Sequence, residues 1–369
     1  MIQYIQVLRF FAALVVVLHH ARPPLIPSSM LSDLPAWLHA VAEMGFSGVD
    51  IFFVISGAIM AETTRHLSPG PKTSFKFISI RFTRIYSGWW PFFFVYLAAS
   101  FLFRGLPEEK NLLASFFLWP QNLNHQLLPI VWTLCFELYF YAVLGALLFL
   151  KRKTARLALL AWALVIFGFT VFNWVTGLYT PARFGDVSLL HDFYASPLVL
   201  EFVAGFLICD LIRAKPQFSW MPFALIGIPL ISFATWYQLN GQLAASGMAG
   251  FHHVPERVIF IGGSACCLLA CALLWRPPTG RVTRIFASLG DASYAIYLSH
   301  IAVIYALSLF LTRLGWDDTL PSHFIILFSV IAVVSYSWLH YRWVERPLYN
   351  AVRSRLFSSQ STLPLTRHA

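Results

Sequence analysis

The feature of this sequence that most constrains its fold is a series of long apolar runs. A membrane-spanning helix needs about 20 mostly apolar residues. Runs of about this length occur at 4–21, 41–61, 85–103, 130–150, 157–176, 193–213, 218–238, 256–275, 291–312 and 323–344. Because backbone polar groups inside a bilayer must be hydrogen-bonded within the protein, such runs are expected to fold as helices. We therefore predict an all-α, polytopic integral membrane protein with about ten transmembrane helices.

Composition and the remaining segments favour the same class. Hydrophobic residues make up 58% of the chain and charged residues only 11%, whereas soluble domains carry roughly 25% charged residues. So few charges cannot cover a soluble surface, and the apolar residues are expected to face lipid. The first run has no basic residue before Arg9 and no small-residue cleavage site, so we interpret it as a retained helix. Proline and polar residues interrupt the segment 112–128, which predicts a loop or a re-entrant piece buried in protein.

The distribution of Lys and Arg predicts the orientation. With the N-terminus in the cytoplasm, 19 basic residues fall on the cytoplasmic side and 6, including Arg257, fall in outer loops. Basic residues collect in cytoplasmic loops, so both termini are predicted to be cytoplasmic. The chain then comprises a membrane domain, 1–350, and a short cytoplasmic tail, 351–369, which is expected to be disordered beyond Arg355. Because the net charge of +10 gathers beside the membrane, we expect membrane lipids, and no nucleic acid, as partners.

Ionisable residues inside the apolar runs are the natural candidates for function, because a charge at the bilayer centre costs about 2.5–3.5 kcal/mol. The first run carries Arg9 and His20. At about 100° per residue these two lie on one helix face, roughly 16 Å apart along its axis, and His19 points about 100° away. The spacing favours His20 as an active-site residue, and a position at the outer interface is the alternative.

Three ionisable residues of the next runs each have a structural and a functional interpretation. Asp50 lies in an apolar run rich in Gly and Ser, where it either serves the chemistry or pairs with an arginine in a tightly packed interface. Arg81 and Arg84 precede the third run and share a helix face at the predicted cytoplasmic boundary. Paired guanidinium groups suit a phosphate-bearing cofactor, and topogenic charge or contact with anionic lipid is the alternative.

Two later runs carry further polar side chains. Glu137 lies among aromatic residues, with Tyr141 one turn later on the same face. A buried Glu there needs a basic residue or a substrate hydroxyl as its partner. Tyr294, Tyr297 and His300 are spaced by three and form a polar stripe, for which a hydrogen-bonded helix interface is the alternative.

Cysteine usage predicts neither a disulfide nor a metal site. All five cysteines lie inside apolar runs, where they act as small packing residues. They are Cys135, Cys209, Cys266, Cys267 and Cys271.

Taken together and in order, six motifs resemble the bacterial membrane acyltransferase-3 family, which includes O-antigen and exopolysaccharide O-acetyltransferases. The matching residues are Leu8, Arg9, His20 and Ala21, then Gly48 to Gly57, Arg81 and Arg84, Trp132 and Glu137, Tyr294, Tyr297, Leu298 and His300, and Glu345 to Pro347. The chain departs from the family at Cys135-Phe136, where Ser-Val is frequent, and at Leu138, where a second Glu is frequent. These departures leave open the shape of the pocket around Glu137. Many relatives add a periplasmic esterase-like domain, and the shorter form here resembles exopolysaccharide-type members.

The resemblance implies an acyltransferase in the bacterial cytoplasmic (inner) membrane. Its expected reaction moves an acetyl group from cytosolic acetyl-CoA to a sugar hydroxyl of an exopolysaccharide, another cell-surface glycan or a lipid-linked oligosaccharide precursor. His20 is expected to be the catalytic base, and Glu137 to orient the acceptor or His20. Arg81, Arg84 and Arg9 are expected to bind the cofactor, with Arg9 otherwise paired to Asp50. Four residues are expected to line the substrate cavity: Asp50, Tyr141, Tyr297 and His300.

Three alternatives stay open at this level. Transfer is either direct or passes through an acyl-imidazole on His20. A transporter or flippase for a lipid-linked sugar would share the basic inner face, but it predicts inverted repeats and broken helices in both halves, which the sequence does not show. A sensor or scaffold would leave the shared face of Arg9 and His20 unexplained.

Overall fold

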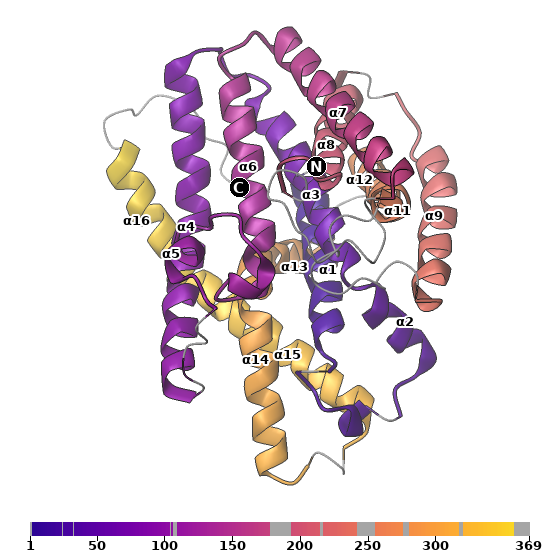
Figure 1. Ribbon diagram of the computed structural model, residues 1–369, viewed down its shortest axis with the longest axis vertical. Coiled ribbons are helices and arrows are strands. Elements are labelled where there is room, and N and C mark those ends of the chain that lie inside the picture. Colours follow the sequence, from indigo (N-terminus) through magenta and orange to yellow (C-terminus); the bar gives the residue numbers. More distant parts are fainter. Residues whose placement is uncertain are drawn as a thin grey trace. The chain divides into compact units, whose positions relative to one another are not determined.

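A computed structural model describes residues 2–23, 25–31, 33–103, 105, 109–177, 193–214, 217–241, 255–275, 280–316 and 320–357. Within these residues the chain is helical and has no strand, which confirms the all-α prediction (Figure 1). The helices are α1 (Ile2–His20), α2 (Ala36–Met44), α3 (Ser47–Thr64), α4 (Pro71–Phe103), α5 (Leu112–Phe116), α6 (Trp132–Leu147), α7 (Arg152–Val175), α8 (Leu198–Ala214), α9 (Met221–Leu239), α11 (Pro255–Arg257), α12 (Gly263–Leu274), α13 (Arg281–Asp291), α14 (Ser293–Arg313), α15 (Ser322–His340) and α16 (Arg346–Phe357).

The chain forms two compact units. The terminal unit comprises 1–49, 87–92 and 277–369, and the central unit comprises 50–86 and 93–276. In the terminal unit α1 packs against α2, α13, α14 and α15, and α14 lies beside α15 (Figure 1). In the central unit α8 packs against α7 and α12, and α12 packs against α9.

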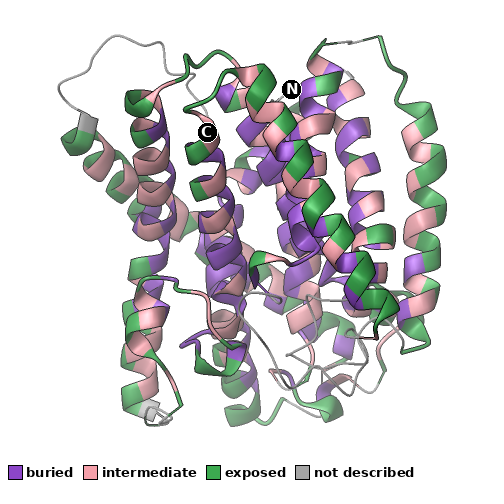
Figure 2. Ribbon diagram, turned by 45° about the horizontal axis from the view of Figure 1, so that its top comes forward, coloured by how far each residue is buried: buried purple, intermediate pink, exposed green. Residues whose placement is uncertain are grey.

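Helices of transmembrane length confirm the polytopic prediction. In the described ranges, nine helical segments are long and apolar enough to cross a bilayer. The tenth predicted span corresponds to α8, which has 17 residues. Large apolar side chains point outward from several of these helices; Val175 of α7 is 79% exposed and Leu225 of α9 is 74% exposed. Figure 2 shows α9, at the right of the view, exposed or half-buried along most of its length. Outward-facing apolar residues of this kind suit contact with lipid rather than water.

Three boundaries differ from the prediction. The run 41–61 contains two helices, because the chain breaks between α2 and α3 at Gly45, and glycine is among the least favourable residues inside a helix. α4 begins at Pro71, so the arginines expected before a helix lie within it. α16 continues to Phe357, so the predicted tail begins as helix, and 358–369 lie outside the described residues.

The polar segment between α4 and α6 does not cross the membrane as a helix. It contains the short helix α5 and two single 3-10 turns. Two hydrogen bonds within the segment hold it together: the Leu127 amide donates to Ser115 Oγ at 2.8 Å, and Lys110 Nζ donates to the Gln126 carbonyl at 2.7 Å. Ser115 and Gln126 are 0% exposed, but Leu113 is 70% and Trp119 62% exposed, so the segment is a loop, as predicted, that is buried only in part.

A close approach of two helices sets the register of the central unit. A Cβ on Gly57 of α3 would lie 2.0 Å from the Phe202 carbonyl oxygen of α8, and a Cβ on Gly205 of α8 would lie 1.9 Å from the Val54 carbonyl oxygen of α3. Only glycine allows backbones to approach so closely. Asp50 near the start of α3 interacts with Glu201 near the start of α8, and Glu62 near the end of α3 pairs with Arg213 near the end of α8, so the two helices run parallel.

In the terminal unit, Asp33 anchors the first turn of α15. Its Oδ1 accepts a hydrogen bond from the Ser322 amide at 2.9 Å and another from the Ser322 hydroxyl. Both hydrogen bonds hold the pKa of the Asp33 carboxyl below its ordinary value, and the one from the Ser322 hydroxyl contributes most. A carboxylate at a helix N-terminus also interacts favourably with the helix dipole.

Asp33→Ala is expected to lower the melting temperature of the purified protein at neutral pH. Because the folded pKa lies below the unfolded one, this stabilisation is fully present above about pH 4, the ordinary Asp value, and is lost as pH falls through the folded pKa. The difference in Tm between wild type and variant should therefore shrink on acidification, measured by thermal unfolding in detergent. Glu109→Ala, at an exposed loop acid, is the control. A difference that does not depend on pH would contradict the assignment.

Candidate functional site

Two histidines meet in the terminal unit. His20 ends α1, and His300 lies in the second turn of α14 and is 0% exposed. The distance from His300 Nε2 to His20 Nδ1 is 3.2 Å, and the ring centroids are 4.7 Å apart. The structure thus brings together two candidates that are 280 residues apart in the sequence.

Backbone carbonyls define which nitrogen of each ring carries the proton. His20 Nδ1 lies 3.0 Å from the Val16 carbonyl oxygen, and His300 Nδ1 lies 2.7 Å from the Tyr297 carbonyl oxygen. A carbonyl only accepts, so each neutral ring carries its proton on Nδ1. His300 Nε2 is then an acceptor for the shared Nδ1–H of His20. The lone pair of His20 remains on Nε2, which has no hydrogen-bond partner among the described residues.

His19 differs from its neighbour in having both ring nitrogens engaged. Nδ1 lies 2.9 Å from the Ala42 carbonyl oxygen of α2, and Nε2 lies 3.4 Å from an Arg22 amino group. Arg22 in turn pairs with Glu43. These contacts tie His19 to the α1–α2 packing, and they support the preference for His20 that helix geometry gave.

The remaining candidates of the terminal unit lie on the same two helices. Tyr297 is 7% exposed, and its ring centroid is 5.8 Å from that of His300. Arg9 donates to Gln6 Oε1 at 3.0 Å, one turn earlier in α1. Tyr297 therefore joins the histidine pair, and one contact of Arg9 is with its own helix.

In the central unit, Arg81, Tyr141 and Glu137 form one network. The Arg81 guanidinium lies 5.8 Å from the Tyr141 ring centroid, and the Tyr141 hydroxyl donates to Glu137 Oε1. The same oxygen accepts from Ser56 Oγ at 2.9 Å. The partners of Glu137 are thus two protein hydroxyls, and the sequence alone did not indicate Ser56. Arg84 lies one turn beyond Arg81 and interacts electrostatically with Tyr141.

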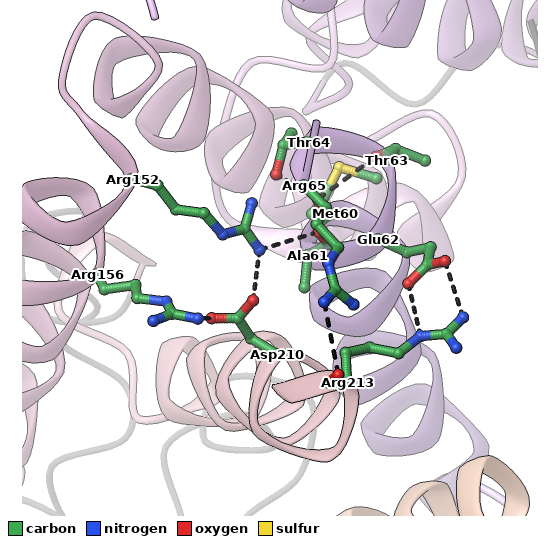
Figure 3. Close-up of polar contacts among 10 residues, drawn as sticks. All are labelled: Met60, Ala61, Glu62, Thr63, Thr64, Arg65, Arg152, Arg156, Asp210 and Arg213. Carbon is green, nitrogen blue, oxygen red and sulfur yellow. Dashed lines mark hydrogen bonds and ion pairs between the residues drawn. The ribbon is translucent and has the colours of Figure 1, made fainter. Parts of the chain in front are cut away.

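Arg81 also connects this network to a group of ion pairs at the end of α3 (Figure 3). It is 8% exposed and donates to Thr63 Oγ1 at 3.0 Å. In the same turn of α3, Glu62 accepts two hydrogen bonds from Arg213 of α8, at 2.9 and 2.8 Å.

Asp210 of α8 completes the group of ion pairs. Its two carboxylate oxygens bind Arg152 and Arg156, which are one turn apart at the start of α7 (Figure 3). Arg65 donates to the Arg213 carbonyl oxygen at 3.5 Å. A single carboxylate therefore holds two guanidinium groups at this end of the unit.

Asp50 lies in a second charged group, which is fully buried. Arg257 donates from Nε to Oδ1 at 2.9 Å and from Nη2 to Oδ2 at 2.8 Å, and the two side chains are 0% and 2% exposed. Glu201 of α8, 2% exposed, interacts electrostatically with both. Arg257 is therefore a buried ion-pair partner, and its assignment to an outer loop was wrong. Asp50 pairs with this arginine, as the packing interpretation of the sequence proposed, rather than with Arg9.

The residues that the sequence interpretation missed carried a usable signal. Glu201 and Asp210 both lie in the apolar run 193–213 and meet the criterion that selected Asp50 and Glu137. Ser56 had no such signal, because serine is common in tightly packed membrane helices. Within the described ranges, no three His, Cys, Asp or Glu side chains are placed to hold a metal ion.

Known proteins with similar sequences indicate the chemistry. Residues 2–342 match the acyltransferase-3 family, described as an acyltransferase domain. The chain is also 30% identical over 325 residues to the exopolysaccharide production protein ExoZ of Rhizobium meliloti (strain 1021). The aligned region covers 85% of this chain and 92% of ExoZ. No solved structure matches significantly.

The buried pair of Asp50 and Arg257 is expected to be worth more than any surface ion pair. Removing one partner, as in Arg257→Gln, should destabilise the protein by about 3–5 kcal/mol, because it leaves an unpaired buried charge. Adding Asp50→Asn to that variant should recover part of the loss, and Glu201→Gln should be neutral or stabilising, since two acids compete for one guanidinium. Thermal unfolding in detergent is measured for wild type, Arg257→Gln, Asp50→Asn, the double variant of these two, and Glu201→Gln. Strict additivity of the two single losses would contradict the direct pairing.

Proposed function

Because the chain belongs to the acyltransferase-3 family of membrane acyltransferases, we propose that it transfers an acetyl group from cytosolic acetyl-CoA to a sugar hydroxyl of an exopolysaccharide or its lipid-linked precursor. The proposed location is the bacterial cytoplasmic membrane, with both termini in the cytoplasm. The helices of transmembrane length and the distribution of basic residues support this location.

The observation that carries the proposal is the free Nε2 of His20. A sugar hydroxyl is a poor nucleophile at neutral pH and needs a base. A neutral imidazole with one nitrogen fixed as a donor presents the other as a base. The contacts of Nδ1 with Val16 and His300 create that condition at His20.

In the proposed direct route, His20 acts first as a base and then as an acid. His20 Nε2 removes the proton of the acceptor hydroxyl while the oxygen attacks the thioester carbonyl carbon. The tetrahedral intermediate collapses, the C–S bond breaks, and the departing sulfur takes the proton from the imidazolium. In a two-step route the same Nε2 would attack the thioester and carry the acetyl group. Both routes depend on the same atom.

His300 acts in this proposal as a positioning residue. It accepts the Nδ1–H of His20, fixes the ring orientation, and keeps an acceptor beside the imidazolium that forms. A group that orients the base in this way is the third member of many nucleophile–base arrangements.

The central unit supplies groups suited to the two substrates. Arg81, with Arg84 one turn away, is suited to a phosphate-bearing donor. Glu137 already accepts hydrogen bonds from two hydroxyls, the chemistry with which a carboxylate would hold a sugar. The name of the similar protein ExoZ favours an exopolysaccharide as the acceptor.

His20→Ala is expected to reduce transfer from radiolabelled acetyl-CoA by about 10²–10⁴-fold, the usual contribution of a general base. His19→Ala should retain most of the activity, because the hydrogen bonds of the His19 ring are to Ala42 and Arg22 and its contact with His20 is an edge-on ring contact. The assay uses purified protein in nanodiscs with an isolated glycan fraction as acceptor. Full activity of His20→Ala, or equal losses in both variants, would overturn the assignment.

His300→Ala is expected to lower kcat by about 10–100-fold with little change in the KM for acetyl-CoA, because it removes an acceptor that orients the base. His300→Gln should restore part of kcat, since its amide oxygen can accept the same hydrogen bond. Steady-state kinetics of the three proteins separate the two parameters. A change in KM alone would assign His300 to substrate binding instead.

A further inference from the structure

The ion pairs at the end of α3 contain more positive than negative charge. Four arginines meet there, and we call them the arginine cluster: Arg65, Arg152, Arg156 and Arg213 (Figure 3). In the described part of the chain, two carboxylates pair with them, those of Glu62 and Asp210. Four guanidinium groups and two carboxylates leave a net charge of +2, and such an excess of like charge is unfavourable for packing unless an anion offsets it.

The cluster retains unused hydrogen-bond donors. Arg156 Nε is buried and has no acceptor, although the same side chain binds Asp210. Among the residues with described positions, Arg65 has one weak hydrogen bond, to a backbone carbonyl at 3.5 Å. A guanidinium carries five N–H donors in a planar fork, so these two arginines can accept a tetrahedral anion without losing their present contacts.

Partial exposure makes the cluster accessible to a ligand from the aqueous side. The side chains of Arg152 and Arg213 are 30% exposed and that of Arg156 is 41% exposed, whereas Asp210 between them is 6% exposed. The acid thus lies beneath the arginines and holds them in place. Such an arrangement presents a preorganised basic surface, which lowers the cost of binding an anion.

The cluster is continuous with the arginine that the proposed function assigns to the donor. Arg81 binds Thr63, and Thr63 lies between Glu62 and Arg65 in the last turns of α3. The end of α3 thus contacts both Arg81 and members of the arginine cluster. It lies on the side that the distribution of Lys and Arg predicts to be cytoplasmic.

We propose that the arginine cluster binds the 3′-phosphate at the nucleotide end of the coenzyme A donor. This inference rests on the proposed function, since it extends the donor site from Arg81 to the arginine cluster. A ribose 3′-phosphate is close to a dianion at neutral pH and matches the net charge of the cluster. Bidentate guanidinium contacts are the strongest that a protein offers to such a group.

The test compares two donors that differ only in this phosphate: acetyl-CoA and acetyl-dephospho-CoA. The key variant is Arg156→Gln, which leaves the Arg152–Asp210 pair intact. The matched control is Lys153→Gln, which removes the same charge from an exposed position in the same turn of α7. Reconstitution in phosphatidylcholine nanodiscs excludes anionic lipid headgroups.

Wild type should prefer acetyl-CoA over acetyl-dephospho-CoA in kcat/KM. Arg156→Gln should lower kcat/KM for acetyl-CoA by about tenfold and leave acetyl-dephospho-CoA almost unchanged, because one charge-assisted hydrogen-bonding partner is lost. Arg156→Lys should restore part of the preference, and Lys153→Gln should keep all of it.

Two results would overturn the proposal. Equal losses of Arg156→Gln with both donors would assign Arg156 to packing. A loss seen only when phosphatidylglycerol is added to the nanodiscs would identify a lipid phosphate as the ligand. Failure of the proposed function gives a different result, since wild type would then transfer acetyl groups from neither donor.

Discussion

The close contact between α3 and α8 is the constraint on which the central unit depends. With glycine at Gly57 and Gly205, the two helix backbones approach too closely for any other residue to fit. The parallel register that follows places Asp50 beside Glu201 near one end and Glu62 beside Arg213 near the other. Two small residues therefore decide where four charged side chains meet.

The two charged layers set by this register differ in their surroundings, and so in what they can do. Asp50 and Arg257 are excluded from solvent and pair with each other through two hydrogen bonds. The arginines at the opposite end of α3 are partly exposed and outnumber their acids. A neutral buried pair favours a fixed packing arrangement, whereas an exposed positive excess attracts anions. Similar residue types thus stabilise the packing near one end of α3 and, in our proposal, bind an anion at the other end.

Hydrophobic periodicity predicted most of the fold, and intramembrane ionisable residues supplied most of the candidates for the site. Two groups of residues selected from local spacing do meet in the structure. One is the pair of His20 and His300, and the other comprises Arg81, Tyr141 and Glu137. The partner of Asp50 could not be predicted, because Arg257 lies 207 residues away in the sequence. Arg257 also stands at the polar edge of an apolar run, where a loop is expected. The prediction of helix boundaries failed where a helix extends beyond its apolar part. The first turns of α4 are polar, so the hydropathy of the sequence did not include them in the predicted span. Sequence patterns therefore identify helices and isolated charges, whereas pairing depends on helix register.

The membrane setting explains why neutral groups hold the histidine pair. His20 Nδ1 contacts a backbone carbonyl and a second imidazole within the terminal unit, and neither brings a charge. A carboxylate in the same place would have to be desolvated in every resting enzyme, at a cost of several kcal/mol. Neutral acceptors fix the ring without that cost, but they provide no counter-charge for an imidazolium. In the proposed transfer, the developing thioester oxyanion provides that counter-charge, so the cation would form only when both substrates are bound.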